Sequence, residues 1–499
     1  MIRHDQARSG KNKHDQDYSN MPIQRVKSAV RSASEVWSLA WPTVITMMSY
    51  TMMQFVDSMM VARLGPVELS AQGNGGVWTW TVIAVLIGAI SLVNTFVAQS
   101  VGAGELAAVA RYAWSGIWLA IGSWIFILIP TGFLLFPLAF SWMGHEPLLE
   151  KLELDYSQIL IVGGVFTLVG KAINNFFFGI GRPKVVTIAA ILGNIVNLVL
   201  NYVFIFGERG IPELELPGIP GLAPMGVAGS ALATVIGTAC ECALPLAIFF
   251  GKEMSTEFGT RVAWRPDMPA IKDLIRVGWP ASVQFGNEMF CWSVFMTVIV
   301  GTFGTTHLAA GWIVLRYMHL SFMPAVGFSI ATTTLVGRSI GANDPDLAMR
   351  YARTAVWMSV AYMTAWGILM VIFREPMIRI FTSNAVDGSV SPEVVVEIGA
   401  KIMICAATFQ AFDAIGIVYS GALRGAGDTF WPGVATVAFS WIVIVGGGYW
   451  IAFKHPHLGS LGPWIGSTVY IVAISVFMAW RFERGPWRTH KLVRHATSP

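Results

Sequence analysis

Residues 97–112 read VAQSVGAGELAAVARY, and residues 336–351 read VGRSIGANDPDLAMRY. The two stretches align without a gap at a spacing of 239 residues, and the Trp-Pro pair at 41–42 recurs at nearly the same spacing at 279–280. Both copies lie among long apolar runs. A chain built twice over from membrane spans is typical of a transporter, with its substrate path between the two copies.

The composition indicates a membrane protein. The chain has 499 residues, of which 55% are hydrophobic and 12% charged, and its mean hydropathy is +0.60. Soluble domains carry roughly twice that charge. Apolar segments of about 20 residues, enough to cross a bilayer core of about 30 Å as helices, recur along the whole chain. We predict twelve spans, at 37–62, 77–101, 112–137, 157–180, 185–206, 227–250, 274–301, 308–336, 352–373, 394–421, 430–453 and 460–481.

The fold class is therefore an all-α integral membrane protein, and the alternating strands of a membrane barrel are not visible. The repeat carries the first span onto the seventh. Since six spans per copy is an even number, both copies insert in the same orientation and form two six-helix lobes, a parallel repeat. We expect five segments, an N-tail at 1–36, an N-lobe at 37–250, a linker at 251–273, a C-lobe at 274–481 and a C-tail at 482–499.

The distribution of Lys and Arg predicts the topology. With the N-terminus placed inside, 24 of these residues fall on that side, 6 on the other, and 3 within spans. This asymmetry predicts that both termini are cytoplasmic. No apolar signal-peptide region follows the charged start, so residues 1–36 are expected to form a flexible tail. We expect a multi-pass protein of the plasma membrane, or of the inner membrane in a bacterium.

The expected partners and cofactors are inferred from binding motifs that are not visible in the sequence. The net charge of +4 comes without a basic patch interleaved with aromatic residues, so no nucleic-acid partner is expected. No GxxxxGK[ST] loop is visible, which argues against direct ATP drive. Cys240 and Cys242 point to different faces of an apolar helix, so neither a disulfide framework nor a cysteine metal site is indicated. We expect a monomer in contact with lipids and small organic substrates, with no cofactor beyond a coupling ion.

Four acidic residues lie within the predicted spans: Asp57, Glu241, Glu288 and Asp413. An acid at mid-depth costs about 2.5 kcal/mol or more, so each indicates a functional site. Polar residues at helical spacing accompany three of them, and we predict that these neighbours bind substrate: Tyr50 and Gln54 with Asp57, Gln284 with Glu288, and Gln410 with Asp413.

Asn194, Asn197 and Asn201 form a further polar stripe in the same lobe as Asp57, and we expect Asn197 and Asn201 to supply donors and acceptors to a polar pocket around Asp57. The alternative is that the acids pair with cations inside the spans, for which Lys171, Arg316 and Lys401 are available. That pairing is as good an explanation as function for Glu241.

Several strings resemble one family. GALRGAGDTFWP at 421–432 is similar to the loop after the tenth span of multidrug and toxic compound extrusion (MATE) transporters. NIVNLVLNYVFIFG at 194–207 and GVAGSALATVIG at 226–237 resemble the family's fifth and sixth spans, and MQFVDSMMVARLG at 53–65 its first. The resemblance covers all twelve spans and is strongest to the NorM-like branch, so it implies a MATE-like fold.

The resemblance implies roles for the acids. The family's span-1 aspartate corresponds to Asp57, and the NorM-like branch's cation-coupling acids correspond to Glu288 and Asp413, which would hold Na⁺. The family's span-5 pair corresponds to Asn197 and Asn201. Another branch has an aspartate at the second of these positions, so a proton shared between two N-lobe carboxylates is in doubt here.

The implied function is a secondary antiporter, not an enzyme, in which inward flow of Na⁺ or H⁺ drives export of bulky, often cationic organic compounds. A lipid-linked oligosaccharide flippase of similar two-lobe plan remains an alternative because Lys171, Arg316 and Lys401 could contact a pyrophosphate. An intramembrane lipid-modifying enzyme is a weaker alternative, since no HExxH or GxSxG motif is visible.

The topology is directly testable. A reporter that is active only outside the cytoplasm, fused to the C-terminus, is expected to give no signal because of the Lys/Arg asymmetry. A clear signal would overturn the even number of spans.

Overall fold

The computed structural model describes residues 6–211, 217–382, 392–489 and 492, and its elements are helices. The α-helices are α1 (Gln6–Ala62), α2 (Pro66–Ile90), α3 (Leu92–Ala103), α4 (Leu106–Ser123), α5 (Phe136–Met143), α6 (Pro147–Gly179), α7 (Pro183–Asn201), α8 (Gly226–Phe249), α9 (Lys252–Phe258), α10 (Met268–Val294), α11 (Thr305–Gly341), α12 (Pro345–Ile372), α13 (Arg374–Thr382), α14 (Pro392–Ala426), α15 (Phe430–Phe439), α16 (Gly448–Lys454) and α17 (Leu461–Arg484).

The twelve predicted spans are confirmed. Eleven continuous helical segments within the described part of the chain are long and apolar enough to cross a membrane. The twelfth span is the second half of α1, which packs along α7 and α11. Some spans combine several helices. The third runs from α4 to α5, and the eleventh from α15 to α16.

One pair of π-helical turns occupies matching places in the two copies of the repeat, whereas the π-turns at Trp124–Leu128, Thr131–Leu135 and Phe295–Ile299 have no π-helical counterpart in the described part of the other copy. One follows α7 at Tyr202–Phe206, and another follows α15 and begins at Ser440. The two starts are 238 residues apart, the spacing of the Trp-Pro pairs. A π-turn inserts an extra residue into a helix and often marks a functional position.

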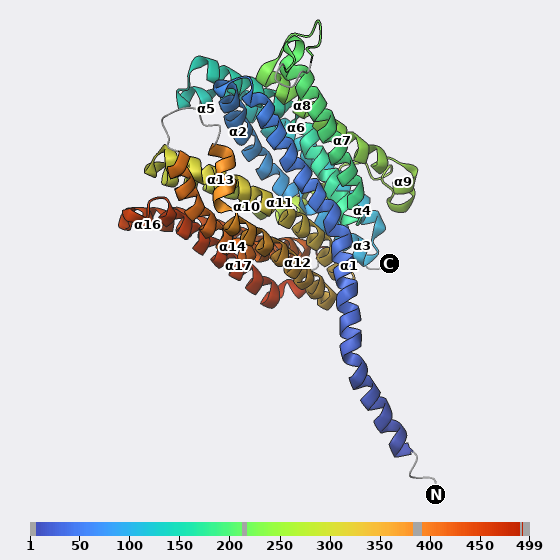
Figure 1. The fold of residues 1–499 in the computed structure, drawn as a ribbon. Coiled ribbons are helices and arrows are strands. Elements are labelled where there is room, and N and C mark those ends of the chain that lie inside the picture. The colour runs from blue at the N-terminus through green and yellow to red at the C-terminus, as the bar shows by residue number, and fades with distance from the viewer. Residues whose placement is uncertain (1–5, 212–216, 383–391, 490–491, 493–499) are drawn as a thin grey trace.

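The N-terminal segment differs from the expected flexible tail. The structure continues α1 as a helix from Gln6, and Figure 1 shows its first half extending away from the bundle. Straight-chain residues that favour helices, such as Gln, Lys and Arg, are frequent in this segment. Nearer the bundle, Arg31 and Glu35 form a pair one helical turn apart, with Nε and Oε1 separated by 3.0 Å.

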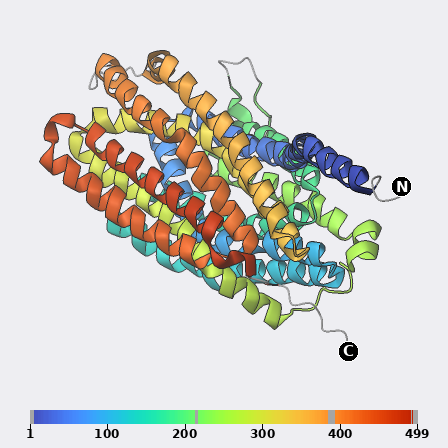
Figure 2. The same cartoon turned by 90° about the horizontal axis from the view of Figure 1, so that it is seen from below.

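The helices form two lobes. In Figure 1 the N-lobe, α1–α8, occupies one side of the bundle and the C-lobe, α10–α17, the other. Both chain termini lie at the same end of the bundle, as Figure 2 also shows, and we refer to this end as the termini side. The lobes meet there and diverge toward the opposite end, the far side. Every hydrogen bond that described residues of the two lobes form with one another lies in the half nearer the termini.

Matching glycines lie where the lobes touch. A Cβ added to Gly102 of α3 would come within 2.0 Å of the carbonyl oxygen of Arg338, and a Cβ added to Gly341 of α11 within 2.1 Å of the carbonyl oxygen of Gln99. The repeat spacing of 239 residues exchanges the two glycines and also exchanges Gln99 with Arg338. The contact therefore has pseudo-two-fold symmetry, and only glycine allows the backbones to approach so closely.

Side-chain hydrogen bonds across this contact follow the same symmetry. Residues of α3 and α11 each donate to carbonyl oxygens in the last turn of a helix of the opposite lobe. The pairs are Thr95 to Arg424 (2.9 Å), Thr334 to Phe178 (3.2 Å), Gln99 to Gly425 (3.0 Å) and Arg338 to Gly179 (3.4 Å). We refer to these bonds and the two glycines as the inter-lobe gate. It closes one end of the space between the lobes, where α1 and α10 also pack into the core of the opposite lobe.

The gate predicts a site-specific effect of side-chain size. Gly341→Val is expected to destabilise the closed arrangement by about 1–3 kcal/mol, because the new side chain meets backbone. The apparent melting temperature of the purified protein should fall. Gly122→Val is the matched control, since nothing lies within 4 Å of a Cβ at that helical position. Equal melting temperatures for the two variants would contradict the close approach.

Candidate functional site

The C-lobe holds two acids that have no hydrogen-bond partner among the described residues. Glu288 lies on α10 and Asp413 on α14, and both side chains are half-buried. Neither carboxylate accepts a hydrogen bond from another described residue, and their charges lie close enough to interact. Buried carboxylates without donors are costly inside a membrane. This pair is therefore suited to bind a cation or a proton.

Arg424 lies near these acids and was missed by the sequence analysis, which counted it as a loop residue. It lies in the last turn of α14, where its guanidinium is 4.9 Å from the ring centre of Phe285 and within electrostatic range of Glu288. Its backbone carbonyl belongs to the inter-lobe gate and accepts the hydrogen bond from Thr95. One residue thus connects the acid of the C-lobe to the gate.

The two glutamines predicted for substrate binding differ in accessibility. Gln284 lies one turn from Glu288 on α10 and is half-buried. Gln410 is only 1% exposed, and it accepts a 2.7 Å hydrogen bond from Ser321 while its amide nitrogen approaches Met370. Gln410 therefore links α14 to α11 and α12, and it is not accessible to a ligand in this conformation.

The N-lobe brings together the predicted residues of α1 and α7. Asp57 is 6% exposed and accepts a short hydrogen bond from Asn201 and one of 3.5 Å from Thr234 of α8. Asn201 also donates to Asn197 at 3.1 Å, and Asn197 donates to Thr234 at 3.3 Å. The structure thus places Asp57, Asn197 and Asn201 in one cluster, as expected. Thr234 was missed because an isolated threonine carries no distinguishing pattern.

A series of hydrogen bonds along α1 and α7 holds the two helices together and so positions Asp57 beside Asn201. Thr46 donates to Thr187 at 3.0 Å, and Asn194 donates to Ser49, which lies one turn farther along α1 while Asn194 lies two turns farther along α7. The partners differ by 141 to 145 residues throughout, because the two helices run side by side in the same direction. Small polar residues of this kind join helices inside membranes.

Tyr50 belongs to a second N-lobe cluster, which corrects its assignment to the Asp57 stripe. It donates a short hydrogen bond to Glu241 of α8, and Asn174 of α6 donates to the same oxygen at 3.3 Å. The Lys171 ammonium lies 4.4 Å from the centre of the Tyr50 ring and within electrostatic range of Glu241. Tyr50 lies two turns before Asp57 on α1, so it meets α6 and α8 at a different depth. Gln54 lies between the two levels and is exposed.

The three cations within predicted spans do not form a common site. Lys171 belongs to the Tyr50–Glu241 cluster. Arg316 lies 5.6 Å from the centre of the Phe381 ring, and Lys401 pairs with Glu397 at 2.7 Å on an exposed face. Of these three cations, Lys171 therefore supports the pairing alternative for Glu241, whereas the cation near Glu288 is Arg424.

Among the described residues, the buried polar side chains of the spans offer ligands for a hard cation and not for a transition metal. Within the described ranges, no three His, Cys, Asp or Glu side chains gather as a transition-metal site would require. The Asp57 cluster offers a different donor set. The side-chain oxygen of Asn201 is buried and has no hydrogen-bond donor. Together with the Asp57 carboxylate it offers the oxygen ligands preferred by hard cations such as Na⁺.

The family of the chain is established by comparison with known proteins. The MatE family model matches residues 42–203 and 285–450, which is most of both lobes. The chain belongs to the MatE family. The multidrug resistance protein NorM of Burkholderia vietnamiensis is 31% identical over 91% of this chain and 95% of that protein. A probable NorM of Thermotoga maritima is 29% identical over 91% and 92%.

Solved MATE structures share the fold. A transporter of the MOP superfamily from Pyrococcus furiosus superposes with a TM-score of 0.82 at 21% identity, covering 92% of this chain and 97% of that one. A MATE family transporter described as outward-facing gives a TM-score of 0.78 at 20% identity, covering 91% and 96%. These similarities support the two-lobe arrangement of a multi-pass MatE transporter.

The Asp57 cluster predicts two effects of changing charge. Asp57→Asn is expected to reduce transport roughly tenfold or more, since the N-lobe would lose its cation-binding charge. Asn201→Asp is expected to shift the pH optimum, because two carboxylates in contact share one proton. The measurement is efflux from proteoliposomes across a range of pH.

Asn194→Asp serves as the control, because it adds a carboxylate to the same face of α7 without contacting Asp57. Normal transport by Asp57→Asn together with an unchanged pH profile for Asn201→Asp would show that this cluster is structural.

Proposed function

We propose that this MatE transporter exports bulky organic compounds, often cationic, in exchange for Na⁺ or H⁺. The observation that carries this proposal is the pair Glu288 and Asp413, whose carboxylates have no hydrogen-bond partner among the described residues. Relatives named as multidrug resistance proteins support export as the direction and drugs as the substrate class.

A shared acid provides the exchange. A carboxylate inside a membrane is stabilised when a proton, a Na⁺ or an organic cation neutralises it, and each of these excludes the others. Binding of one ligand therefore favours release of the other, as antiport requires. The Asp57 cluster, with its unsatisfied Asn201 oxygen, supplies a second place for the ion in the N-lobe.

Arg424 provides a route from the acids to the gate. When Glu288 is charged, it attracts the guanidinium of Arg424, and the backbone of Arg424 holds Thr95 of the opposite lobe. When Glu288 is neutralised, this attraction is lost and the last turn of α14 is held less firmly. The gate then opens more readily, since a ligand shifts an equilibrium by its unequal affinity for the two states.

The orientation follows from the Lys/Arg asymmetry. With both termini in the cytoplasm, the gate closes the cytoplasmic end of the space between the lobes, and the structure faces outward. The protein then lies in the plasma membrane, or the inner membrane in a bacterium.

Neutral variants of the C-lobe acids test the coupling site. Glu288→Gln and Asp413→Asn are each expected to abolish coupled export while leaving the protein folded, because neither carboxylate accepts a hydrogen bond from a described residue. Efflux is measured at equal expression. Glu397→Gln is the control, since that acid is exposed and pairs only with Lys401. Near-normal efflux in either variant would remove that residue from the coupling role.

The coupling ion is identified in proteoliposomes. Efflux of a fluorescent cation is measured under an imposed Na⁺ gradient and, separately, an imposed pH gradient. We expect one of the two gradients to drive efflux. An ionophore that collapses this gradient should stop the efflux. Lipid translocation without ion-driven efflux would favour a flippase, and product formation would favour an enzyme.

A further inference from the structure

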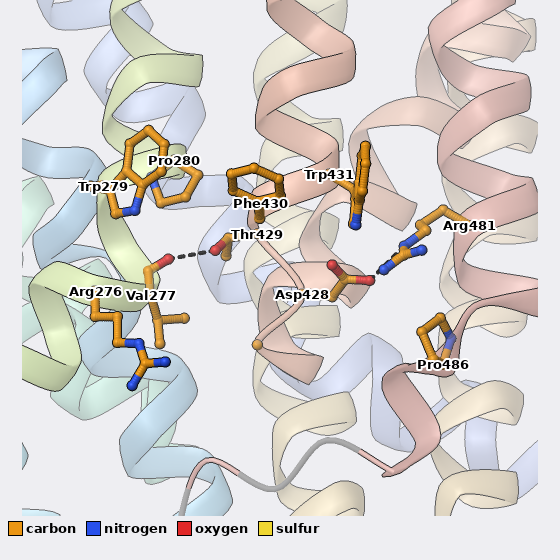
Figure 3. Close-up of a pocket in the computed structure, with 11 residues that line it drawn as sticks. Arg276, Val277, Trp279, Pro280, Asp428, Thr429, Phe430, Trp431, Arg481 and Pro486 are labelled. Carbon is orange, nitrogen blue, oxygen red and sulfur yellow. Dashed lines mark hydrogen bonds and ion pairs between the residues drawn. The ribbon is translucent and has the colours of Figure 1, made fainter.

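A pocket of about 390 Å³ lies on the termini side of the C-lobe, away from the acids (Figure 3). It is an open pocket lined by the third and fourth turns of α10, the segment between α14 and α15, the start of α15 and the end of α17. A second pocket of about 580 Å³ adjoins it, and Arg276 lines both. Transport as proposed above does not use this region.

The walls of the pocket are held by contacts of their own. Asp428 and Arg481 form a buried ion pair with Nε and Oδ2 separated by 2.7 Å, and Thr429 donates a 2.5 Å hydrogen bond to the carbonyl of Val277 (Figure 3). The first contact ties the segment before α15 to α17, and the second ties it to α10. The pocket is therefore preformed, and its one acid is already paired.

Positive charge without a partner among the described residues lies where the two pockets adjoin, since Lys272 lines the second pocket and Arg276 lines both. Arg276 and Lys272, one turn apart on α10, are both exposed and form no ion pair or hydrogen bond with described residues. The acid between them, Asp273, accepts a hydrogen bond from Tyr112 of the N-lobe at 3.4 Å. An anion could neutralise this charge, and arginine binds phosphate oxygens in a bidentate manner.

Aromatic side chains line the other part of the pocket. Trp279, Phe430 and Trp431 are 48%, 46% and 50% exposed, although each is large and apolar. Trp279 and Phe430 pack edge to face, with ring centres 6.0 Å apart. Exposed tryptophans at the end of a membrane span are typical of the headgroup level of a bilayer.

We propose that this pocket binds the headgroup of an anionic phospholipid from the leaflet on the termini side. Arg276 and Lys272 hold the phosphate, and the three aromatic rings contact the glycerol and the upper acyl chains. Basic pockets between helices at this depth suit such headgroups. The lipid would also contact Gly427, two residues after the gate residue Gly425.

The purified full chain is placed in nanodiscs that contain both phosphatidylglycerol and phosphatidylcholine. After the protein is released from the nanodiscs, native mass spectrometry measures how much of each lipid stays bound to it. The wild type should retain phosphatidylglycerol in preference to phosphatidylcholine. Arg276→Gln should retain about fivefold less, the effect expected for one basic residue at a membrane surface. Arg276 is exposed and forms no ion pair or hydrogen bond with the described residues, so this variant is expected to fold normally. Arg265→Gln, an exposed arginine outside both pockets, is the control and should match the wild type.

Three results would overturn the proposal. The first is equal retention of the two lipids by the wild type. The second is equal retention of phosphatidylglycerol by Arg276→Gln and the wild type. The third is displacement of the lipid by millimolar inorganic phosphate, which would show a site for free phosphate in place of a headgroup.

Discussion

The structure depends on a close backbone contact between the two lobes at positions that the repeat makes equivalent. Gly102 meets Arg338, and Gly341 meets Gln99, at distances that exclude any side chain beyond hydrogen. Membrane helices gain little from burying apolar surface against each other, so close packing and hydrogen bonds decide which faces associate. The gate is therefore a compact contact of backbone and hydrogen bonds that closes one end of the space between the lobes.

The two lobes use their buried acids differently. In the N-lobe, Asp57 is surrounded by donors, and Glu241 is held by Tyr50, Asn174 and Lys171. In the C-lobe, Glu288 and Asp413 lack such donors, and Arg424 is the nearest opposite charge that the structure shows. The pseudo-symmetric scaffold thus carries an asymmetric distribution of charge. We therefore propose that ions and substrates exchange mainly in the C-lobe and that the N-lobe offers a second ion site.

Much of this architecture could be predicted from the sequence. The span pattern follows from the apolar lengths, and the repeat of residues 97–112 at 336–351 marked the helices that form the gate. Asp57 and Asn201 were expected to meet, and they do. Tyr50 was placed wrongly because helical spacing shows which face a residue occupies but not which neighbour it meets at its depth. Arg424 was missed because α14 extends farther than its apolar run, and Gln410 is enclosed by two helices whose positions only the fold reveals.

The most direct measurement is the distance between the lobes at both ends, by pulsed electron paramagnetic resonance in lipid nanodiscs. Spin labels at Leu106→Cys and Asp346→Cys report on the termini side, and labels at Ser70→Cys and Thr305→Cys report on the far side, in a background without the four native cysteines. We predict that substrate added without the coupling ion lengthens the distance on the termini side and shortens the distance on the far side. Glu288→Gln should weaken both changes. Distances that stay unchanged, or that lengthen together at both ends, would contradict exchange through alternate opening of the gate.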